Sequence, residues 1–236
     1  GGSREYVSQI SARLNDRIET KTKVNGVRRD AGGIVISVEG QGDIWYDKVI
    51  MAAHADESLK LIADASESET QILKAFRFTE NRVILHSDDR LMPKRKRAWA
   101  AWNYMSDAQD NLCATYWMNR LQHIDMSTPL FTTLNPTVEP LDTLVHADLL
   151  YHHPIFDKHT LLAQQKLAGI QGQNHVFWCG AWTANGFHED GLKSAVAVAK
   201  TLNIPIPWDS PTKGYRPNQP ETAMPIDDIA GLFHNR

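Results

Sequence analysis

The chain has 236 residues, 42% of them hydrophobic, and a formal net charge of −3 at pH 7. This length can supply one large hydrophobic core or two modest ones, and the near-neutral charge argues against a general nucleic-acid or polyanion binder. We expect no membrane span, because no run approaches roughly 18 consecutive apolar residues, and no signal peptide. Cys113 and Cys179 lie in apolar runs, so we expect buried free thiols in a cytoplasmic protein rather than a disulfide scaffold.

Residues 1–56 predict a helix followed by short strands. Apolar side chains at helical spacing favour a helix over Glu5–Leu14, and Gly1–Ser3 before it is either a Gly-rich helix start or a cloning remnant. Strands separated by glycine-containing turns are expected at residues 18–24, 26–29, 33–39 and 43–46. The solidly apolar run Val49–Ala53 is typical of a strand that is covered on both faces, as in a parallel sheet.

Residues 57–170 differ in composition, and we expect them to form an inserted substrate domain built on a mixed antiparallel sheet. A polar-faced helical stretch is expected at Glu57–Phe76 and a helix at His159–Ile170. Strands rich in aromatic and branched residues are expected at residues 81–88, 98–105 and 112–119. The proline-punctuated segment 127–140 is expected to lie at the edge of the sheet.

Residues 171–203 predict a strand, a turn and a helix. The strand is expected at His175–Cys179 and the helix over about residues 190–202. Residues 204–236 are rich in Pro and Gly and are expected to form a surface tail. Together these elements predict an α/β (α+β) fold, in which residues 1–56 and the strand–turn–helix unit form one domain around the inserted region.

The start of the last helix has the properties of a binding site for an anion or a polar carbonyl group. The first backbone N–H groups of a helix lack internal partners and carry a partial positive charge. Gly191, in the expected first turn, would let a ligand approach those amides closely. The alternative is an ordinary strand-to-helix corner with Asp190 as the N-cap.

The segment "CGAWTANGFHEDGLKSAVAVA", residues 179–199, resembles the C-terminal cofactor segment of the flavin-dependent amine oxidase superfamily. In that family a strand, a Gly-rich loop and a final helix place backbone amides against the isoalloxazine ring of FAD. Ala181 stands where the family usually has an acidic residue. The FAD-binding residues that this resemblance implies are Gly180, Ala181, Trp182, Phe187, His188, Glu189, Asp190, Gly191 and Leu192.

The other segments follow the same order as in that family. "GGSREYVSQISARL" resembles the Gly-Gly helix of the flavin domain, and residues 18–56 resemble its meander and return strand, with Val24 at the position whose backbone meets the adenine. Residues 83–104 and 151–172 are most similar to a bacterial branch described only as predicted NAD/FAD-binding, amine-oxidase-like proteins. The resemblance covers nearly the whole chain up to about Leu202.

The G-x-G-x-x-G unit that cradles the pyrophosphate in such enzymes has no counterpart in the chain. The resemblance therefore implies the C-terminal portion of a longer FAD-dependent oxidoreductase, which transfers a hydride from a substrate C–H bond to the flavin. Such a portion alone would bind FAD weakly or not at all and be inactive, and the substrate would be an apolar molecule or an amine. A second hypothesis is a non-enzymatic half that needs a partner chain with the dinucleotide-binding unit. It predicts an exposed apolar surface and oligomers.

Ten histidines raise a third hypothesis, a metal-dependent enzyme. Neither the adjacent pair His152 and His153 nor His188 with Glu189 has the spacing of metal ligands, so we expect no metal site. His188, Glu189 and Asp190 either tune the flavin electrostatically or stabilise the helix start. We assign no catalytic residue.

Two further features leave alternatives open. The basic run Pro93–Arg97 is either a solvated loop or a contact for phosphate or a membrane surface. The aromatic residues of the middle strands either line an apolar substrate cavity or fill a core. They are Trp99, Trp102, Tyr104, Tyr116 and Trp117.

Overall fold

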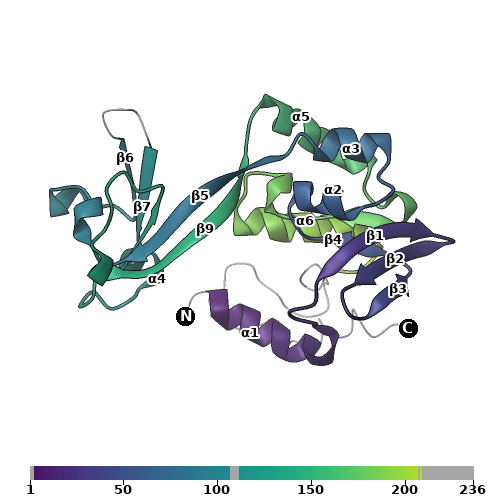
Figure 1. Ribbon diagram of the computed structural model, residues 1–236, viewed down its shortest axis with the longest axis horizontal. Coiled ribbons are helices and arrows are strands. Elements are labelled where there is room, and N and C mark those ends of the chain that lie inside the picture. Colours follow the sequence, from purple (N-terminus) through teal and green to yellow (C-terminus); the bar gives the residue numbers. More distant parts are fainter. Residues whose placement is uncertain (1–2, 107–111, 207, 209–236) are drawn as a thin grey trace. The chain divides into compact units, whose positions relative to one another are not determined.

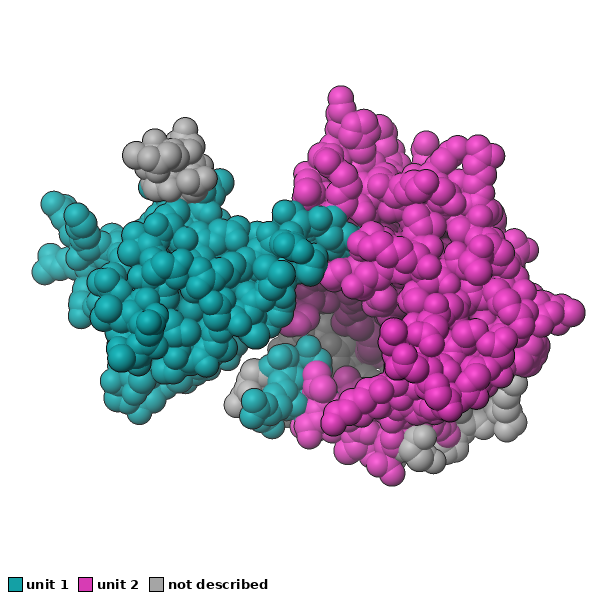
Figure 2. All heavy atoms as spheres, viewed as in Figure 1, with its two compact units in different colours: residues 1–6, 78–153 teal, residues 7–77, 154–236 magenta. Residues whose placement is uncertain are grey.

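The structure is a computed structural model that describes residues 3–106, 112–206 and 208. The chain divides into two compact units, coloured separately in Figure 2. Unit 1 comprises residues 1–6 and 78–153, and unit 2 comprises residues 7–77 and 154–236. Most of the predicted tail, residues 204–236, lies outside the described residues.

Unit 2 contains a three-stranded antiparallel meander in the order β1-β2-β3 (Figure 1). Its strands are β1 (Val24–Asp30), β2 (Gly33–Val38) and β3 (Gly42–Tyr46). The meander confirms the prediction, except that residues 18–23 are not a strand. A 3₁₀ turn, η1 (Asn15–Arg17), precedes them, and Lys21 has a positive φ of 58°, which interrupts extended backbone.

A short parallel pair forms the second sheet of unit 2. In it, β4 (Val49–Met51) pairs with β10 (Val176–Trp178), with Val49 opposite Val176. The backbone N–H of Cys179 extends the pair by donating to the carbonyl of Met51 over 3.1 Å. All three residues of β10 are buried, and the pair is parallel as expected. The expectation that the strand at Val49–Ala53 is covered on both faces is wrong, because β4 ends at Met51 and Ile50 is 49% exposed.

The described α-helices of unit 2 are α2 (Ala55–Leu61), α3 (Glu67–Leu73), α5 (Lys158–Lys166) and α6 (His188–Thr201). The helix α1 (Ser3–Leu14) begins in residues of unit 1 and ends in residues of unit 2. The helical stretch predicted over residues 57–76 is in fact two helices. The break occurs because Ile62 bridges to Val27 of β1 and Ser66 then caps a new helix by accepting from the N–H of Glu69. Ser66 and Glu69 form a reciprocal capping box.

The prediction of an inserted domain over residues 57–170 differs in extent from unit 1. Helices α2, α3 and α5 belong to unit 2, because α2 packs against β1 and α3 packs against α5. The internal segment that belongs to unit 1, residues 78–153, is therefore shorter than the predicted domain, residues 57–170. Its assignment as a substrate domain stays a prediction.

Unit 1 is built on a five-stranded sheet in the order β6-β7-β8-β5-β9. The strands are β5 (Arg77–His86), β6 (Trp102–Ser106), β7 (Leu112–Trp117), β8 (Phe131–Leu134) and β9 (Val145–Ile155). The predicted edge segment is wrong, since β8 lies between β7 and β5. Its prolines, Pro129, Pro136 and Pro140, all lie outside the strand and remove no hydrogen bond from the sheet.

Two of the predicted strands are shorter than expected. Residues 98–101 form the end of a 3₁₀ turn and a bend instead of a strand, and Met118 begins the short helix α4 (Met118–Gln122). The edge strand β9 was not predicted at all. The remaining 3₁₀ turns are η2 (Asp89–Leu91), η3 (Lys96–Ala98), η4 (Asp142–Leu144), η5 (Leu167–Gly169), η6 (Gln173–His175) and η7 (Ala181–Thr183).

The two faces of the unit 1 sheet differ sharply in exposure. One face is buried, with His86, Thr115, Phe131 and Thr133 all at 0%. The strand register puts Trp102, Tyr104 and Leu112 on the opposite face, where they are 48%, 66% and 69% exposed. Within the part of the chain that the structure describes, no helix is both long enough and apolar enough to cross a membrane.

Candidate functional site

The loop after β10 has a backbone shape that requires glycine at two positions. Gly180 has a φ of +148°, and a Cβ atom there would lie 2.5 Å from Nε1 of Trp182. Gly186 has a φ of +88°, and its Cβ would lie 3.2 Å from the ring of Phe156. Residues with side chains rarely adopt these values of φ. The chain's own conformation therefore explains both glycines.

Trp182 anchors this loop from within unit 2. The side chain is 3% exposed, its indole N–H donates to the carbonyl of Ala53 over 3.1 Å, and its ring meets Phe76 edge-on at 4.6 Å. From α5, the amide of Gln164 donates to the carbonyls of Trp182 and Ala184. The buried indole thus holds the loop in place and presents little surface to a ligand.

Helix α6 begins at His188, two residues before the predicted start. Its N-cap is Phe187, whose side chain has no acceptor atom, so the interpretation of Asp190 as the N-cap is wrong. Asp190 lies in the first turn, and its Oδ2 accepts from the backbone N–H of Phe187 at 3.0 Å and of Asn185 at 3.2 Å. The Asp190 carboxylate therefore holds the loop to the first turn of the helix. The N-cap side chain itself accepts no hydrogen bond from the first-turn N–H groups.

Ser194 locks the loop to the helix. Its hydroxyl accepts from the N–H of Gly180 at 2.9 Å and donates to the carbonyl of Gly191 at 2.7 Å. Neither Ser194 nor Gln164 was identified from the sequence. Both act through contacts between distant segments, and nothing in their local pattern distinguishes them from ordinary helix residues.

The surface around the first turn of α6 is open and apolar. Phe156, Phe187 and Leu192 are 42%, 59% and 49% exposed. A Cβ atom placed at Gly191 would approach only one atom within 4 Å, the backbone N of Ala181 at 3.8 Å. The chain therefore has room for a Cβ atom at Gly191, so its packing does not demand a glycine there. The N–H groups of Asp190 and Gly191 both donate to the carbonyl of Phe187.

Two other implied site residues, Glu189 and Val24, and the neighbouring Cys179 lie in unit 2 as well. The Glu189 carboxylate is exposed and lies 3.8 Å from Nζ of Lys193 on the same helix. Val24 opens β1 opposite Val38, next to a register shift, and is half-buried in the same unit as the loop. Burial raises the pKa of the Cys179 thiol, which precedes the loop, and this favours the neutral thiol.

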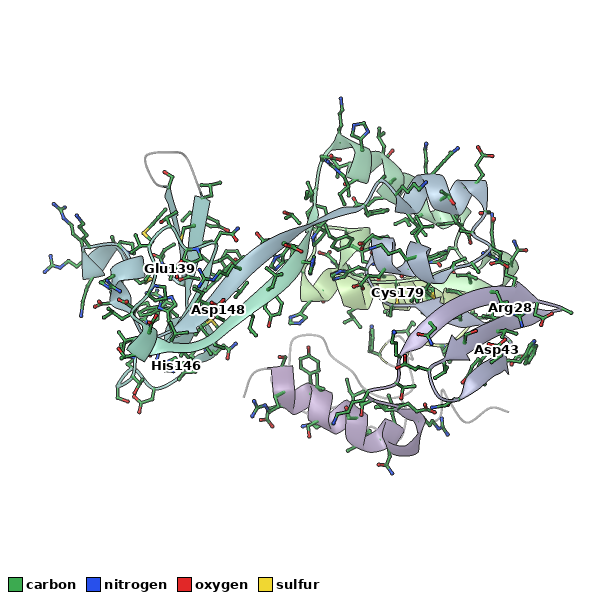
Figure 3. All side chains as sticks on the ribbon, viewed as in Figure 1. Arg28, Asp43, Glu139, His146, Asp148 and Cys179 are labelled. Atoms are coloured by element: carbon green, nitrogen blue, oxygen red, sulfur yellow. The ribbon has the colours of Figure 1, made fainter. Side chains whose placement is uncertain are left out.

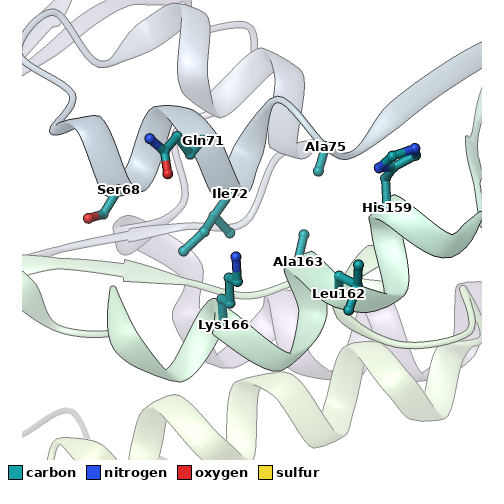
Figure 4. A pocket seen from close by; sticks show the side chains of 8 residues that line it. All are labelled: Ser68, Gln71, Ile72, Ala75, His159, Leu162, Ala163 and Lys166. Carbon is teal, nitrogen blue, oxygen red and sulfur yellow. The ribbon is translucent and has the colours of Figure 1, made fainter.

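The described part of unit 2 has several hollows. A hollow of about 350 Å³ has Gln164, Trp178 and Ser194 among its lining residues. Two others differ in whether they include implied site residues. One, of about 700 Å³, runs along the exposed face of α6 and includes two of the implied site residues. It is lined by Glu189, Leu192, Lys193, Val196, Ala197, Lys200 and Trp208. The other, of about 290 Å³, lies between α3 and α5, with His159 and Lys166 on the α5 side (Figure 4), and includes no implied site residue.

The middle aromatic residues lie on both faces of the unit 1 sheet, and whether any of them lines a substrate cavity stays a prediction. Trp99 and Trp117 pack edge-to-face at 5.3 Å, and Trp99 also meets the buried ring of Phe131, so both fill the core of unit 1. Trp102 packs edge-on against Tyr116 on the opposite, exposed face. Among the described residues, no three His, Cys, Asp or Glu side chains gather as metal ligands would.

Comparisons with known proteins link this arrangement to solved flavoenzymes. No protein-family model matches the chain, and no curated protein matches it. Among solved structures, a CLA-producing fatty acid isomerase from P. acnes matches with a TM-score of 0.57 and 12% identity, over 86% of this chain and 52% of that one. A putrescine oxidase matches with a TM-score of 0.57 and 10% identity, over 86% and 53%. Cyclohexylamine oxidase from Brevibacterium oxydans matches with a TM-score of 0.51 and 12% identity, over 86% and 53%.

A reduced UDP-galactopyranose mutase matches as well, with a TM-score of 0.54 and 12% identity, over 83% of this chain and 50% of that one. The chain thus spans about half the length of the structures that it matches. The likeness establishes the fold, and the resemblance read from the sequence is confirmed at that level. These neighbours are flavin amine oxidases and related FAD enzymes, and this chain has the fold of part of such an enzyme.

Proposed function

We propose that the chain forms the flavin-ring side of an FAD-dependent oxidoreductase of amine-oxidase type. The observation that carries the proposal is the start of α6, where Phe187 supplies no capping acceptor and the space beside Gly191 is open. Amides with a partial positive charge suit the polar edge of a flat ring. The exposed side chains of Phe187 and Leu192 suit its apolar face. The fold shared with FAD enzymes supports the same ligand.

The chain's residues would divide the work of holding FAD. Phe187, His188, Glu189, Gly191 and Leu192 would border the ring, and the backbone of Val24 would meet the adenine. Gly180, Trp182 and Ser194 would keep the loop in shape, while Asp190 would hold the helix start in register. When bound, FAD would supply the chemistry, by accepting a hydride from a substrate C–H bond.

An amine or an apolar molecule is the substrate class that we propose. One solved neighbour is a putrescine oxidase with putrescine bound, and another is a fatty acid isomerase. Neither assigns a substrate to this chain. The exposed aromatic side chains of Trp102 and Tyr104 support an apolar ligand surface in unit 1.

Titration of the purified chain with FAD tests the proposal, followed by flavin fluorescence and the visible absorbance spectrum. The wild type should bind saturably, and Gly191→Trp should abolish binding by filling the open space. Gly169→Trp is the matched control, because a side chain at Gly169 meets nothing within 4 Å. Equal binding by both variants would contradict the proposal. If the chain shows no saturable binding up to about 1 mM FAD, where the binding free energy would be only about −4 kcal/mol, the titration is repeated on the chain extended by an N-terminal dinucleotide-binding unit. Absence of binding by that extended protein would contradict the proposal.

A second candidate function is a non-enzymatic half that binds a partner chain carrying a dinucleotide-binding unit. The β4/β10 sheet favours it, because it has only two strands and exposes Ile50 of β4 at 49%. Two-stranded sheets are marginal by themselves, and an exposed strand is a surface for pairing. Light scattering would show oligomers of the wild type that dissociate in Ile50→Lys if this surface mediates association.

A further inference from the structure

A separate feature of unit 1 is a short run of four cations, Lys94, Arg95, Lys96 and Arg97, which we call the basic turn. All four side chains are exposed. The backbone N–H of Ala98 donates to the carbonyl of Arg95 at 2.8 Å, and that of Trp99 donates to the carbonyl of Lys96 at 3.1 Å. Lys96 and Arg97 therefore lie in the 3₁₀ turn η3, and Lys94 and Arg95 directly precede it.

The basic turn rests on the core of unit 1. The indole N–H of Trp99 donates to the carbonyl of Pro93 over 2.8 Å, and the Trp99 ring packs on Trp117 and Phe131. Just before the turn, Met92 is 3% exposed. These contacts hold the backbone that carries the four cations, so binding a partner would require little ordering of that backbone.

The four cations of the basic turn differ from Arg82 and Arg90 in having no ion-pair partner among the described residues. Arg82 pairs with Asp148 and Glu139 at 2.7 Å, two residues labelled in Figure 3, and Arg90 pairs with Asp88. In the described part of the chain, no carboxylate lies within ion-pair distance of the basic turn. Lys96 instead lies 5.5 Å from the centre of the Trp99 ring.

Exposed apolar side chains lie at the same end of the sheet. The N–H of Trp117 donates to the carbonyl of Ala101 at 2.9 Å, which joins the start of β6 to the end of β7, and α4 follows directly (Figure 1). This end carries a group that we call the apolar tip, made of Trp102, Leu121, Ile124 and Met126, which are 37–57% exposed. The acidic residue within it, Asp125, accepts from the N–H of Ser127 at 2.8 Å.

We propose that the basic turn and the apolar tip form a docking site for an anionic lipid membrane surface. Clustered lysines and arginines are attracted to anionic headgroups within about a Debye length. Exposed Trp, Ile and Met side chains beside them can enter the boundary between headgroups and acyl chains. The mixture of cations with aliphatic side chains favours a lipid surface over nucleic acid, whose sites combine cations with stacking platforms, and the chain as a whole is acidic.

Co-sedimentation of the full chain with vesicles tests this site. The vesicles are phosphatidylcholine alone, or phosphatidylcholine with about 30% phosphatidylserine. The wild type should bind only the anionic vesicles, and raising the salt to about 0.5 M should weaken binding. A variant with Lys94, Arg95, Lys96 and Arg97 changed to Gln should lose at least about tenfold in affinity.

A matched control changes four exposed cations of unit 2, Lys48, Lys74, Lys158 and Lys166, to Gln and alters the net charge equally. It should bind nearly as the wild type does. The double variant Ile124→Ser, Met126→Ser should weaken vesicle binding while the charge stays the same. Circular dichroism should show that all variants remain folded, since every changed side chain is exposed.

Three results would overturn the proposal. The first is a wild type that does not bind phosphatidylserine vesicles, and the second is an equal loss in the basic-turn variant and the control. The third is binding of the wild type to a single-stranded oligonucleotide, lost in the basic-turn variant, with no binding to vesicles. That result would assign the cations to nucleic acid.

Discussion

The indole N–H of Trp182 donates a hydrogen bond to the carbonyl of Ala53, 3.1 Å away, and so joins the candidate loop to the chain that leaves β4. We expect Trp182→Phe to destabilise the protein by about 2 kcal/mol, because the carbonyl loses its donor and the smaller ring leaves a void. Urea unfolding measures the change. Trp102→Phe, at a half-exposed position, should stay within about 0.5 kcal/mol of the wild type. Equal unfolding midpoints for both variants would contradict this role of Trp182.

The two glycines that flank the helix start should respond to alanine in opposite ways. Gly180→Ala should destabilise the chain by about 2 kcal/mol or more, since its φ is +148° and its Cβ would clash with Trp182. Gly191→Ala should stabilise it by about 0.5–1 kcal/mol, because Gly191 lies inside α6 with room for a methyl group. Thermal unfolding separates the two outcomes.

The Gly191→Ala variant also tests where the flavin binds. If a flavin ring lies against Gly191, Gly191→Ala should bind FAD more weakly although its fold is more stable. Gain of stability with unchanged FAD affinity would show that the ring lies elsewhere. A loss of stability in Gly191→Ala would contradict the open space that the structure has beside this residue.

The sequence predicted the meander, a strand of the parallel type after it and the last strand–loop–helix unit, since each depends on local patterns: turn glycines, an apolar run and helical spacing. It did not predict that β4 pairs with β10. It missed β9, whose residues are mostly exposed and so show no alternation of buried and exposed positions. It placed β8 at an edge because of prolines that in fact flank the strand. Strand order in a sheet is decided by long-range pairing, which local composition does not encode.

The sequence predicted the segment that forms the candidate site but not the hydrogen bonds that hold it in shape. The glycines and charges near Phe187 were visible in the sequence, but the N-cap was misplaced by the preference of Asp for that position. The structure uses Asp190 in the first turn, where its carboxylate accepts from the N–H of Phe187. The roles of Ser194 and Gln164 depend on tertiary contacts and had no sequence signal.

A buried histidine gives unit 1 a pH-dependent stability. His86 is fully buried, its Nδ1 accepts from the N–H of Asp88 at 3.1 Å, and its Nε2 lies 2.7 Å from the hydroxyl of Thr133. Burial lowers the pKa of His86, although the Asp88 charge opposes the change. Because the folded pKa is below the unfolded value of about 6.5, the unfolded state binds the proton more readily. Stability should therefore fall as the pH drops below about 6.5.

Urea unfolding between about pH 5 and pH 7 measures this slope. His86→Phe should be less stable at every pH, because Thr133 and Asp88 lose a partner, but its stability should depend less on pH. Thr133→Val, which removes the hydroxyl and keeps the histidine, should lower stability and keep the wild-type slope. A wild-type slope in His86→Phe would rule out His86 as the source.

Arg29 and Glu69 form a buried ion pair that ties the meander to α3. The Glu69 side chain is 1% exposed, and Arg29 donates to it and to the side chain and backbone of Asp64. Arg29→Met should destabilise the protein by about 3–5 kcal/mol, because it leaves the Glu69 carboxylate buried without a counter-charge. Urea unfolding at neutral pH measures the loss.

The double variant Arg29→Met, Glu69→Gln should recover part of that loss. Gln removes the buried charge, and its side-chain oxygen can still accept from the N–H of Ser66, as Glu69 does at 2.7 Å. A coupling energy above about 1 kcal/mol between the two sites would identify the uncompensated charge as the cause. Arg28→Met is the control, since the pairs of Arg28 with Asp30 and Asp43 are exposed and screened (Figure 3). If Arg28→Met destabilised the protein as much as Arg29→Met, burial of the Glu69 charge would not explain the effect.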